Sequence, residues 1–318
     1  MKATIFSLLI LLTACKPIEE LTNKSKSDGY VTLGNEVTGG DGSGAVVTES
    51  FIQTDTKDLE ILWVIDNSGS MQDEQAAVAS NLSKFANSFV NKDINFTMAI
   101  TTTDDVPAGV LVNGSDTLTS DYARSDAAGF LADFQDMIQV GITGSYRESS
   151  LLAITSYAKN YPHMIKEDAY LAVVILTDEE DSSPLAVSQY VNELKALKKN
   201  AGLVKIFTIC DVNKTNTQSG TDVGCVKDAE ASRLTNGVVS DIRGNFSGIL
   251  TSMGDNLANI VDSFALAHKP VLASLRVFVG GDLVPADQYS YNDATGSIRF
   301  VGQAPAVGAE VKVVYRKR

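Results

Sequence analysis

The chain has 318 residues, 44% hydrophobic and 20% charged, which suits a globular protein with one large domain and a smaller one. Its 39 acidic and 26 basic residues give a net charge of −13, which argues against nucleic-acid binding because phosphate contacts need a basic surface. An acidic surface is compatible with cation binding, and solubility explains it equally well.

The N-terminus has the layout of a secretory signal. The sequence MKATIFSLLILLTAC carries one lysine, an apolar stretch from Ala3 to Leu12 and then small residues. This stretch is too short for a transmembrane helix, which needs about 20 apolar residues. The string Leu12-Thr13-Ala14-Cys15 resembles the bacterial lipobox. The resemblance implies a signal peptide over 1–14 and a lipid on Cys15; the alternative is a plain signal peptide with an incidental cysteine.

We therefore expect a lipid-anchored protein of the bacterial cell envelope. Lys16 stands where inner-membrane lipoproteins usually carry aspartate, which favours the outer membrane, on its periplasmic face or at the cell surface. Residues 15–57 show little apolar periodicity, and TGGDGSG has a linker composition. We expect a flexible tether there, with a strand near 45–51.

From Asp58 onward, predicted strands and helices alternate. Strands are expected at 61–65, 94–104, 170–176, 203–210 and 238–242. Helices are expected around 78–89 and 130–138, from Leu151, from Pro184, and around 229–234 and 246–264. Apolar strands without polar alternation indicate a sheet covered on both faces. The pattern predicts an α/β domain over 58–266, with a doubly wound, mostly parallel sheet.

The pattern changes after His268. The strings SLRVFVGGDLVP, SIRF and EVKVVY are short strands with glycine-rich turns and no helix between them. We expect a small all-β module over 269–318 that packs on the main domain.

Three cysteines are present, and lipidation of Cys15 would leave Cys210 and Cys225. Outside the cytoplasm such a pair favours a disulfide, although two separate buried thiols are the alternative.

Oxygen-rich loops follow three of the apolar strands. These are DNSGS at 66–70, TTTDD at 101–105 and TDEED at 177–181, and GITGSYRE at 141–148 adds further hydroxyls. Ligands of open α/β sheets collect where strands end, and carboxylate and hydroxyl oxygens suit Mg²⁺, Mn²⁺ or Ca²⁺. Without a cation, Asp66 and Asp178 would repel each other.

Asp66-Asn67-Ser68-Gly69-Ser70 resembles the DxSxS motif of the metal-ion-dependent adhesion site in von Willebrand factor A domains, and Thr177-Asp178 resembles that family's second acidic loop. The resemblance covers about residues 58–265. It implies metal contacts by Asp66, Ser68, Ser70 and Asp178, directly or through water, and a hydroxyl from Thr143, with Ser145 as its rival. Asp104, Glu179 and Asp181 would form an outer group of acids or a second ion site, or be solvated charges. The alternative for Asp66 and Ser68 is helix capping.

The resemblance implies a binding protein and not an enzyme. A Mg²⁺, Mn²⁺ or Ca²⁺ ion would be completed by an Asp or Glu of a partner protein. Two alternatives stay open: a structural envelope scaffold whose ion only stabilises the fold, and a metal-dependent hydrolase. No GxxxxGK[ST] phosphate loop or G-x-S-x-G elbow is present in the sequence.

Overall fold

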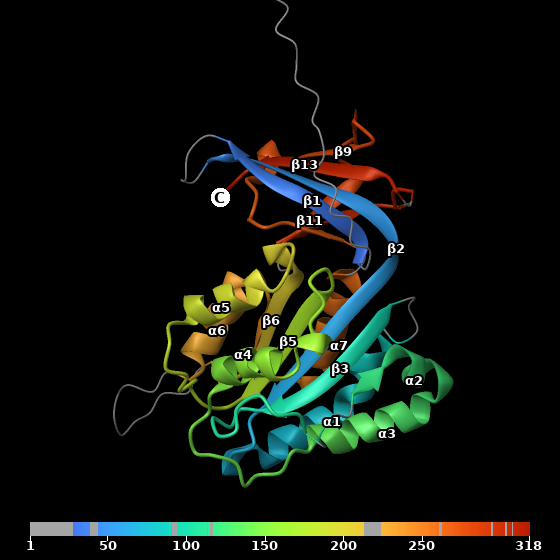
Figure 1. The fold of residues 1–318 in the computed structure, drawn as a ribbon. Helices are drawn as coiled ribbons and strands as arrows, with labels where there is room; N and C mark the ends of the chain where they lie inside the picture. The colour runs from blue at the N-terminus through green and yellow to red at the C-terminus, as the bar shows by residue number, and fades with distance from the viewer. Residues whose placement is uncertain are drawn as a thin grey trace, which may run out of the picture.

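A computed structural model describes residues 28–38, 44–88, 90, 94–112, 114, 117–212, 224–260, 263–293, 295–302, 304–306 and 308–318. The predicted signal peptide over 1–14 and Cys15 lie outside the described residues. Figure 1 shows two parts, an α/β unit below and a β module above, which are joined by one long strand.

The α/β unit is built on a mostly parallel sheet, which confirms the predicted fold class. Strands β3, β2, β5, β6 and β7 run parallel in that spatial order, and β4 adds an antiparallel edge beside β3. Their bounds are β2 (Val46–Ile65), β3 (Asn95–Thr102), β4 (Leu118–Thr119), β5 (Tyr170–Thr177), β6 (Val204–Cys210) and β7 (Val239–Asp241).

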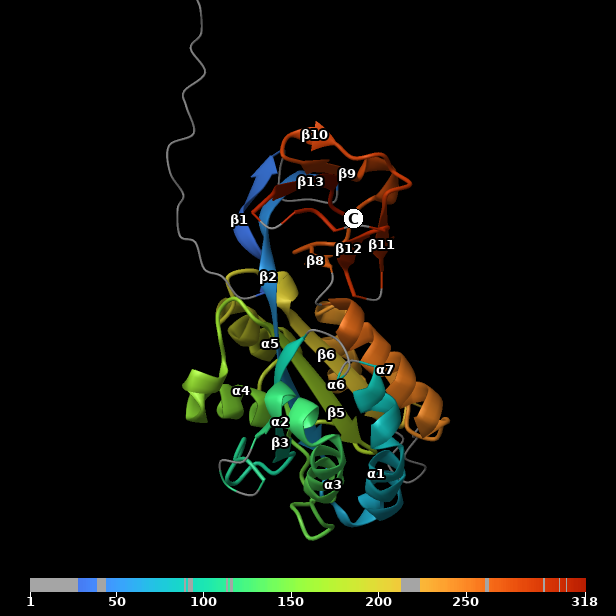
Figure 2. The same ribbon diagram turned by 90° about the vertical axis from the view of Figure 1, so that its right-hand side faces the viewer.

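Helices cover both faces of this sheet (Figure 2). The alternation of β2 divides the core, because Trp63 packs with Phe85 and Phe134 on one face while Leu62 packs in a second cluster on the other. The first face carries α1 (Gln72–Asn87), α3 (Ala127–Ile138) and α7 (Phe246–Ile260); the second carries α4 (Ser150–Asn160), α5 (Val187–Ala196) and α6 (Val226–Leu234). The short helix α2 (Ser120–Ser125) precedes α3, and single turns of 3-10 helix are η1 (Gly69–Met71), η2 (Pro162–Met164), η3 (Ala201–Leu203) and η4 (Leu272–Ser274).

The β module consists of two antiparallel sheets. The first half of β2 lies between β1 (Asp28–Thr38) and β13 (Glu310–Arg316), and β9 (Arg276–Val279) and β10 (Asp282–Leu283) extend the sheet beyond β13. A smaller sheet is formed by β11 (Tyr289–Asn292), β12 (Ser297–Phe300) and β8 (Phe264–Ala265). Phe51 packs on Phe264 at 5.5 Å between ring centroids, so the two sheets share a core.

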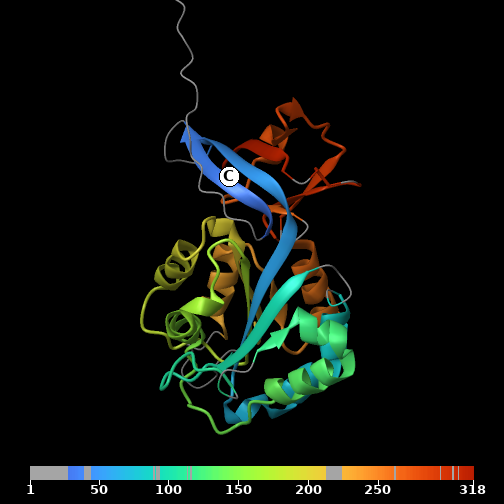
Figure 3. The same cartoon turned by 45° about the vertical axis from the view of Figure 1, so that its right-hand side comes forward.

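The structure corrects the predicted tether over 28–38 and 44–57, which is the part of 15–57 that it describes. Strand β1 begins at Asp28, and β2 runs without interruption from Val46 through the predicted boundary at Asp58 (Figure 3). Ala45, Val47, Glu49 and Phe51 are buried alternately with half-buried neighbours, as expected of a strand with one face on a core. The α/β unit is therefore an insertion in the β module, since the chain leaves the module along β2 and returns to it at β8.

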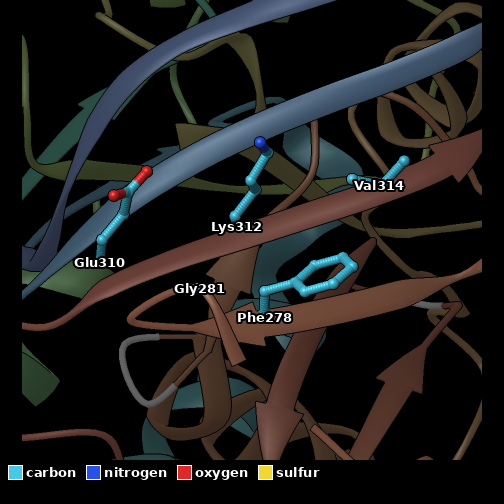
Figure 4. Close-up of a pocket in the computed structure, with 5 residues that line it drawn as sticks. All are labelled: Phe278, Gly281, Glu310, Lys312 and Val314. Atoms are coloured by element: carbon cyan, nitrogen blue, oxygen red, sulfur yellow. The ribbon is translucent and has the colours of Figure 1, made fainter. Parts of the chain in front are cut away.

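One face of the β module carries a hollow of about 420 Å³. Figure 4 shows its lining, which is Phe278 on β9, Gly281 in the turn between β9 and β10, and Glu310, Lys312 and Val314 on β13. Alternate residues of β13 point into it, and Lys312 stands opposite Phe278 in the strand register.

Two further predictions concern covalent and membrane features. Cys210 and Cys225 form a disulfide of 2.03 Å, as predicted, between the end of β6 and the start of α6. Within the described part of the chain, no helix combines the length and apolar character needed to cross a membrane.

Candidate metal centre

The oxygen-rich loops gather at the edge of the sheet that faces away from the β module (Figure 1). Strands β3 and β5 lie on opposite sides of β2, so the order of the sheet reverses between β2 and β5. Asp66 follows β2 and Asp178 follows β5 at this reversal. Parallel strands of this kind leave a crevice for ligands at such a point.

Backbone contacts hold the 66–70 loop in place. The Asp66 N–H donates to the Leu176 carbonyl oxygen at 2.9 Å, which fixes the end of β2 against β5. The Ser68 N–H donates to Asp66 Oδ1 at 2.8 Å and closes the turn. The Gln75 amide donates to the Asp66 and Gly141 carbonyl oxygens, at 2.9 Å each, and links this loop to the loop after α3.

Four of the predicted residues come together. The Ser68 and Ser70 hydroxyl oxygens lie 3.2 Å apart, and Ser70 Oγ donates to Asp178 Oδ1 at 2.9 Å. Asp66 is fully buried and accepts a hydrogen bond from Thr177 Oγ1 at 2.7 Å, whereas Ser70 is exposed. The group is therefore anchored in the sheet and open to solvent at Ser70.

The capping alternative is tested for Ser68. It occupies the N-cap position of η1, but its side chain makes no capping hydrogen bond there. Its hydroxyl instead faces that of Ser70, which leaves both oxygens placed for a shared ligand.

Thr143 and Ser145, the two candidates for a further hydroxyl ligand, do not share the contacts of this group. Thr143 is exposed, and Ser145 Oγ accepts a hydrogen bond from the Arg147 N–H at 3.0 Å within its own turn. Among the described residues, neither hydroxyl hydrogen-bonds to Asp66, Ser68, Ser70 or Asp178. Their roles as ligands stay predictions.

Of the outer acids, Asp104 braces the loops. Its Oδ2 accepts from Asn67 Nδ2 at 2.8 Å and from Thr102 Oγ1 at 2.9 Å, and its Oδ1 accepts from the Ser145 N–H at 2.7 Å. Burial acts to raise the pKa of Asp104, but these hydrogen bonds outweigh it and lower the pKa. The carboxylate therefore joins the loop after α3 to the 66–70 loop.

Glu179 and Asp181 both follow β5 but make different contacts. The Glu179 N–H donates to Thr177 Oγ1 at 3.0 Å, next to the Asp66 carboxylate. Asp181 is buried and accepts from the Leu151 N–H at 3.2 Å and from Ser183 Oγ at 2.7 Å. Asp181 thus caps the first turn of α4, a structural role that its sequence position does not indicate.

Glu148, which lies just before α4, is the residue that sequence reasoning missed. Its side chain is 1% exposed, one oxygen accepts from Thr103 Oγ1, and Oε1 has no hydrogen-bond partner among the described residues. Burial, and after it the charge of Asp66, raises the pKa of Glu148 to about 8. An acid ahead of a helix is normally read as favourable to the helix dipole, so the sequence carried no signal for this burial.

A positive charge would stabilise the ionised acids at this edge of the sheet. Burial raises the pKa of Asp66, and the charge of Asp178 raises it further, against hydrogen bonds from Thr177 and Ser68. Among the described residues, no cluster of three or more His, Cys, Asp or Glu is arranged to hold a metal, so an ion here would need the serine hydroxyls. Adjacent hydroxyls, two repelling acids and an unpartnered buried carboxylate oxygen fit a dication that prefers oxygen ligands.

Comparisons with known proteins bear on the fold. No protein-family model matches the chain, and no curated protein matches it. Among solved structures, a von Willebrand factor type A protein from Catenulispora acidiphila aligns with 94% of this chain and 68% of its own, at 13% identity and a TM-score of 0.47. A pilus adhesin of Lactobacillus rhamnosus GG aligns over 92% of this chain and 43% of its own, at 13% identity and a TM-score of 0.40.

A third structure is proximal thread matrix protein 1 of the mussel byssus with a zinc-occupied MIDAS motif. It aligns over 62% of this chain and 45% of its own, at 15% identity and a TM-score of 0.41. The chain thus spans less than half the length of the adhesin and of the mussel protein. Likeness at this level carries no argument about ligand, metal or partner for the present chain.

Proposed function

We propose that this chain is a metal-dependent binding protein of the cell envelope. A divalent ion, Mg²⁺ or else Mn²⁺ or Ca²⁺, is held by oxygens of Asp66, Ser68, Ser70 and Asp178, with Thr143 or Ser145 as a further donor. The observation that carries the proposal is the Ser68–Ser70–Asp178 oxygen chain, with spacings of 3.2 and 2.9 Å, beside the buried Asp66.

The ion would recruit the partner. With two serine hydroxyls among its donors, a dication is incompletely neutralised and attracts an Asp or Glu side chain of another protein. Ser70 is exposed, so an outside carboxylate can approach from that side. Tyr146 is 88% exposed and Val106 is 84% exposed on the loops that follow α3 and β3, and they would add apolar contact around the acid.

The position of the chain in the envelope follows from the predicted lipid on Cys15, with the outer membrane as its expected location. The described chain begins β1 at Asp28, which pairs with Lys57, and the strand from Lys57 to Ile65 is about 26 Å long at the usual rise per residue. The metal edge therefore lies well away from the start of β1, which suits presentation to a partner.

Two other functions are weighed against binding. A structural scaffold would use the ion only for stability, and the exposure of Ser70 argues against a purely internal ion. A hydrolase of the phosphoryl-transfer type would place a second carboxylate two residues after Asp66, where this chain has Ser68. We therefore favour a binding protein without catalytic activity.

Calorimetric titration with Mg²⁺, Mn²⁺ and Ca²⁺ tests the metal site. The Ser68→Ala/Ser70→Ala variant should lose at least tenfold in affinity for the preferred ion, because it removes two oxygen donors. Ser80→Ala, an exposed serine on α1, is the matched control and should bind as the wild type does. Equal affinity in the wild type and the double variant would remove the proposal.

Recovery of envelope proteins on the immobilised chain, with and without chelator, separates the three functions. A binder retains a partner only with metal, and excess free acetate should weaken that retention. A scaffold ion would leave retention unchanged by chelator once the protein is folded. Turnover of generic phosphoesters that disappears in Asp66→Asn would instead favour a hydrolase.

A further inference from the structure

We propose that Glu148 is a direct ligand of the ion and supplies the donor that we expected from Thr143 or Ser145. The inference rests on the proposed metal site and adds to it a carboxylate ligand beside Asp66. Three observations carry it: the position of the backbone at Glu148, the unpartnered oxygen of its side chain, and the charges that surround it.

The backbone at Glu148 is fixed between two strand ends of the same edge. The Glu148 carbonyl oxygen accepts from the Ser182 N–H at 2.6 Å, and the Ser149 N–H donates to the Thr103 carbonyl oxygen at 2.8 Å. Thr103 follows β3 and Ser182 follows β5, which are the two neighbours of β2. The start of α4 therefore lies across the end of β2, beside Asp66.

The side chain points into the protein. Glu148 is 1% exposed, which is far more buried than Ser70 or Thr143. Thr103 Oγ1 satisfies one carboxylate oxygen, and Oε1 is buried without a hydrogen-bond partner among the described residues. A buried carboxylate oxygen without a partner is costly, so a site that keeps one calls for a ligand.

The surrounding charges select a cation as that ligand. Asp66, Glu179 and Asp104 are the charged groups that act most strongly on Glu148, and all three repel its negative charge. Arg147 is the adjacent residue in sequence, but it lies half-exposed with its guanidinium 3.9 Å from Asp105. A dication between Glu148 and Asp66 would pair with both acids and occupy the free oxygen.

A carboxylate in place of a hydroxyl changes what the site does. Asp66 and Glu148 would bring two full negative charges to the ion, with Asp178 as a contact through water behind Ser70, and ion affinity rises with the number of charged ligands. An outside acid then meets a more neutralised ion than it would in a site completed by a threonine. Glu148 would thus increase the affinity of the site for the ion and weaken the attraction of the bound ion for a partner carboxylate.

The test compares Glu148→Gln with Asp105→Asn in titrations with Mg²⁺, Mn²⁺ and Ca²⁺ alone. Gln keeps the size of the side chain and an acceptor for Thr103, so the fold should persist. Asp105→Asn removes one charge from the same edge without touching a proposed ligand. We expect the Kd of the preferred ion to rise at least tenfold in Glu148→Gln and less than threefold in Asp105→Asn.

The outcomes separate the two proposals. If the wild type binds none of the three ions, the metal site and the role of Glu148 both fall. If the wild type binds and Glu148→Gln binds equally well, only the role of Glu148 is overturned. Equal weakening in both variants would reveal a general charge effect and would also overturn direct ligation.

Water-proton relaxation with bound Mn²⁺ provides a second readout that a purely structural role would not move. Removal of a ligand opens a coordination position to water, so Glu148→Ala should show higher relaxivity per bound Mn²⁺ than the wild type. Unchanged relaxivity in a variant that still binds Mn²⁺ would contradict ligation.

Discussion

The stability of the β module should depend on pH through Glu49. This residue lies in the first half of β2, is fully buried, and accepts hydrogen bonds from Tyr315 Oη and, at 3.1 and 3.2 Å, from the Ala267 N–H. Burial raises its pKa from 4.5 to about 7, and these hydrogen bonds offset only part of that rise. We consider Glu49→Gln, which removes the titration and keeps the size of the side chain.

The raised pKa determines the direction in which the stability changes with pH. Between pH 4.5 and 7 the folded protein holds a proton on Glu49 that the unfolded chain has released, so stability falls as pH rises through this window. Above pH 7 the full cost of the buried charge is present. From pH 5 to pH 8 this residue should lower the free energy of unfolding by about 2.5 kcal/mol, a contribution that Glu49→Gln lacks.

Urea unfolding at several pH values from 5 to 8, followed by far-ultraviolet circular dichroism, measures this effect, because this signal includes the β module whereas the single Trp63 lies in the α/β unit. The comparison uses the change with pH, so any pH-independent cost of the amide cancels. Glu310→Gln, an exposed acid on β13, is the control and should follow the wild type. If Glu49→Gln and the wild type show the same pH dependence, the reasoning from burial is refuted.

Three further predictions concern other parts of the molecule. Burial lowers the pKa of Lys205 from 10.5 to about 7, so above pH 7 the side chain loses its charge when the protein folds. In urea unfolding, the free energy of unfolding of Lys205→Met relative to the wild type should therefore increase by about 3.5 kcal/mol as the pH falls from 10 to 7. Replacement of Cys210 and Cys225 by alanine should lower the free energy of unfolding by about 3 kcal/mol, with reductant lowering the stability of the wild type alone. Asp104→Ala should speed amide exchange at Ser145 at least tenfold by mass spectrometry, since the Ser145 N–H loses a charged acceptor; unchanged exchange would show that the loop is held otherwise.

Much of the fold could be predicted because its signals are local. The apolar run from Ile61 to Ile65 is buried on both sides. The helices predicted around 78–89 and from Leu151, which are α1 and α4, show their buried faces at helical spacing, although α1 already begins at Gln72. Element ends were less accurate: the helix expected from Pro184 begins at Val187, and the helix expected to reach Phe264 ends at Ile260. Such ends depend on contacts with distant residues.

Strand β1 and the full length of β2 could not be derived in the same way. Residues 46–52 of β2 pair with residues 310–316 of β13, and no local pattern specifies partners so far apart. The sequence that joins β1 to β2, around Thr38–Gly44, also has the composition of a flexible linker, so it gave no indication that the two strands pair.

The candidate site was predictable where it depends on strand ends. Asp66 and Asp178 follow parallel strands that are neighbours in the sheet, so their approach follows from topology once both strands are recognised. Thr143 and Ser145 were chosen by residue type, whereas Glu148 is buried because the backbone on either side of it is tied to Thr103 and Ser182. Those ties are tertiary and leave no trace in spacing.

The pairing of β2 with β13 has a consequence for how the chain is made. Val46 lies opposite Arg316, so this half of β2 lacks its β13 neighbour until residue 316 has been synthesised. The inserted α/β unit contains its own parallel neighbours and can mature earlier. During that interval one edge of β2 has unpaired backbone groups, which is the stage at which a nascent chain is most exposed to aggregation and most in need of a chaperone.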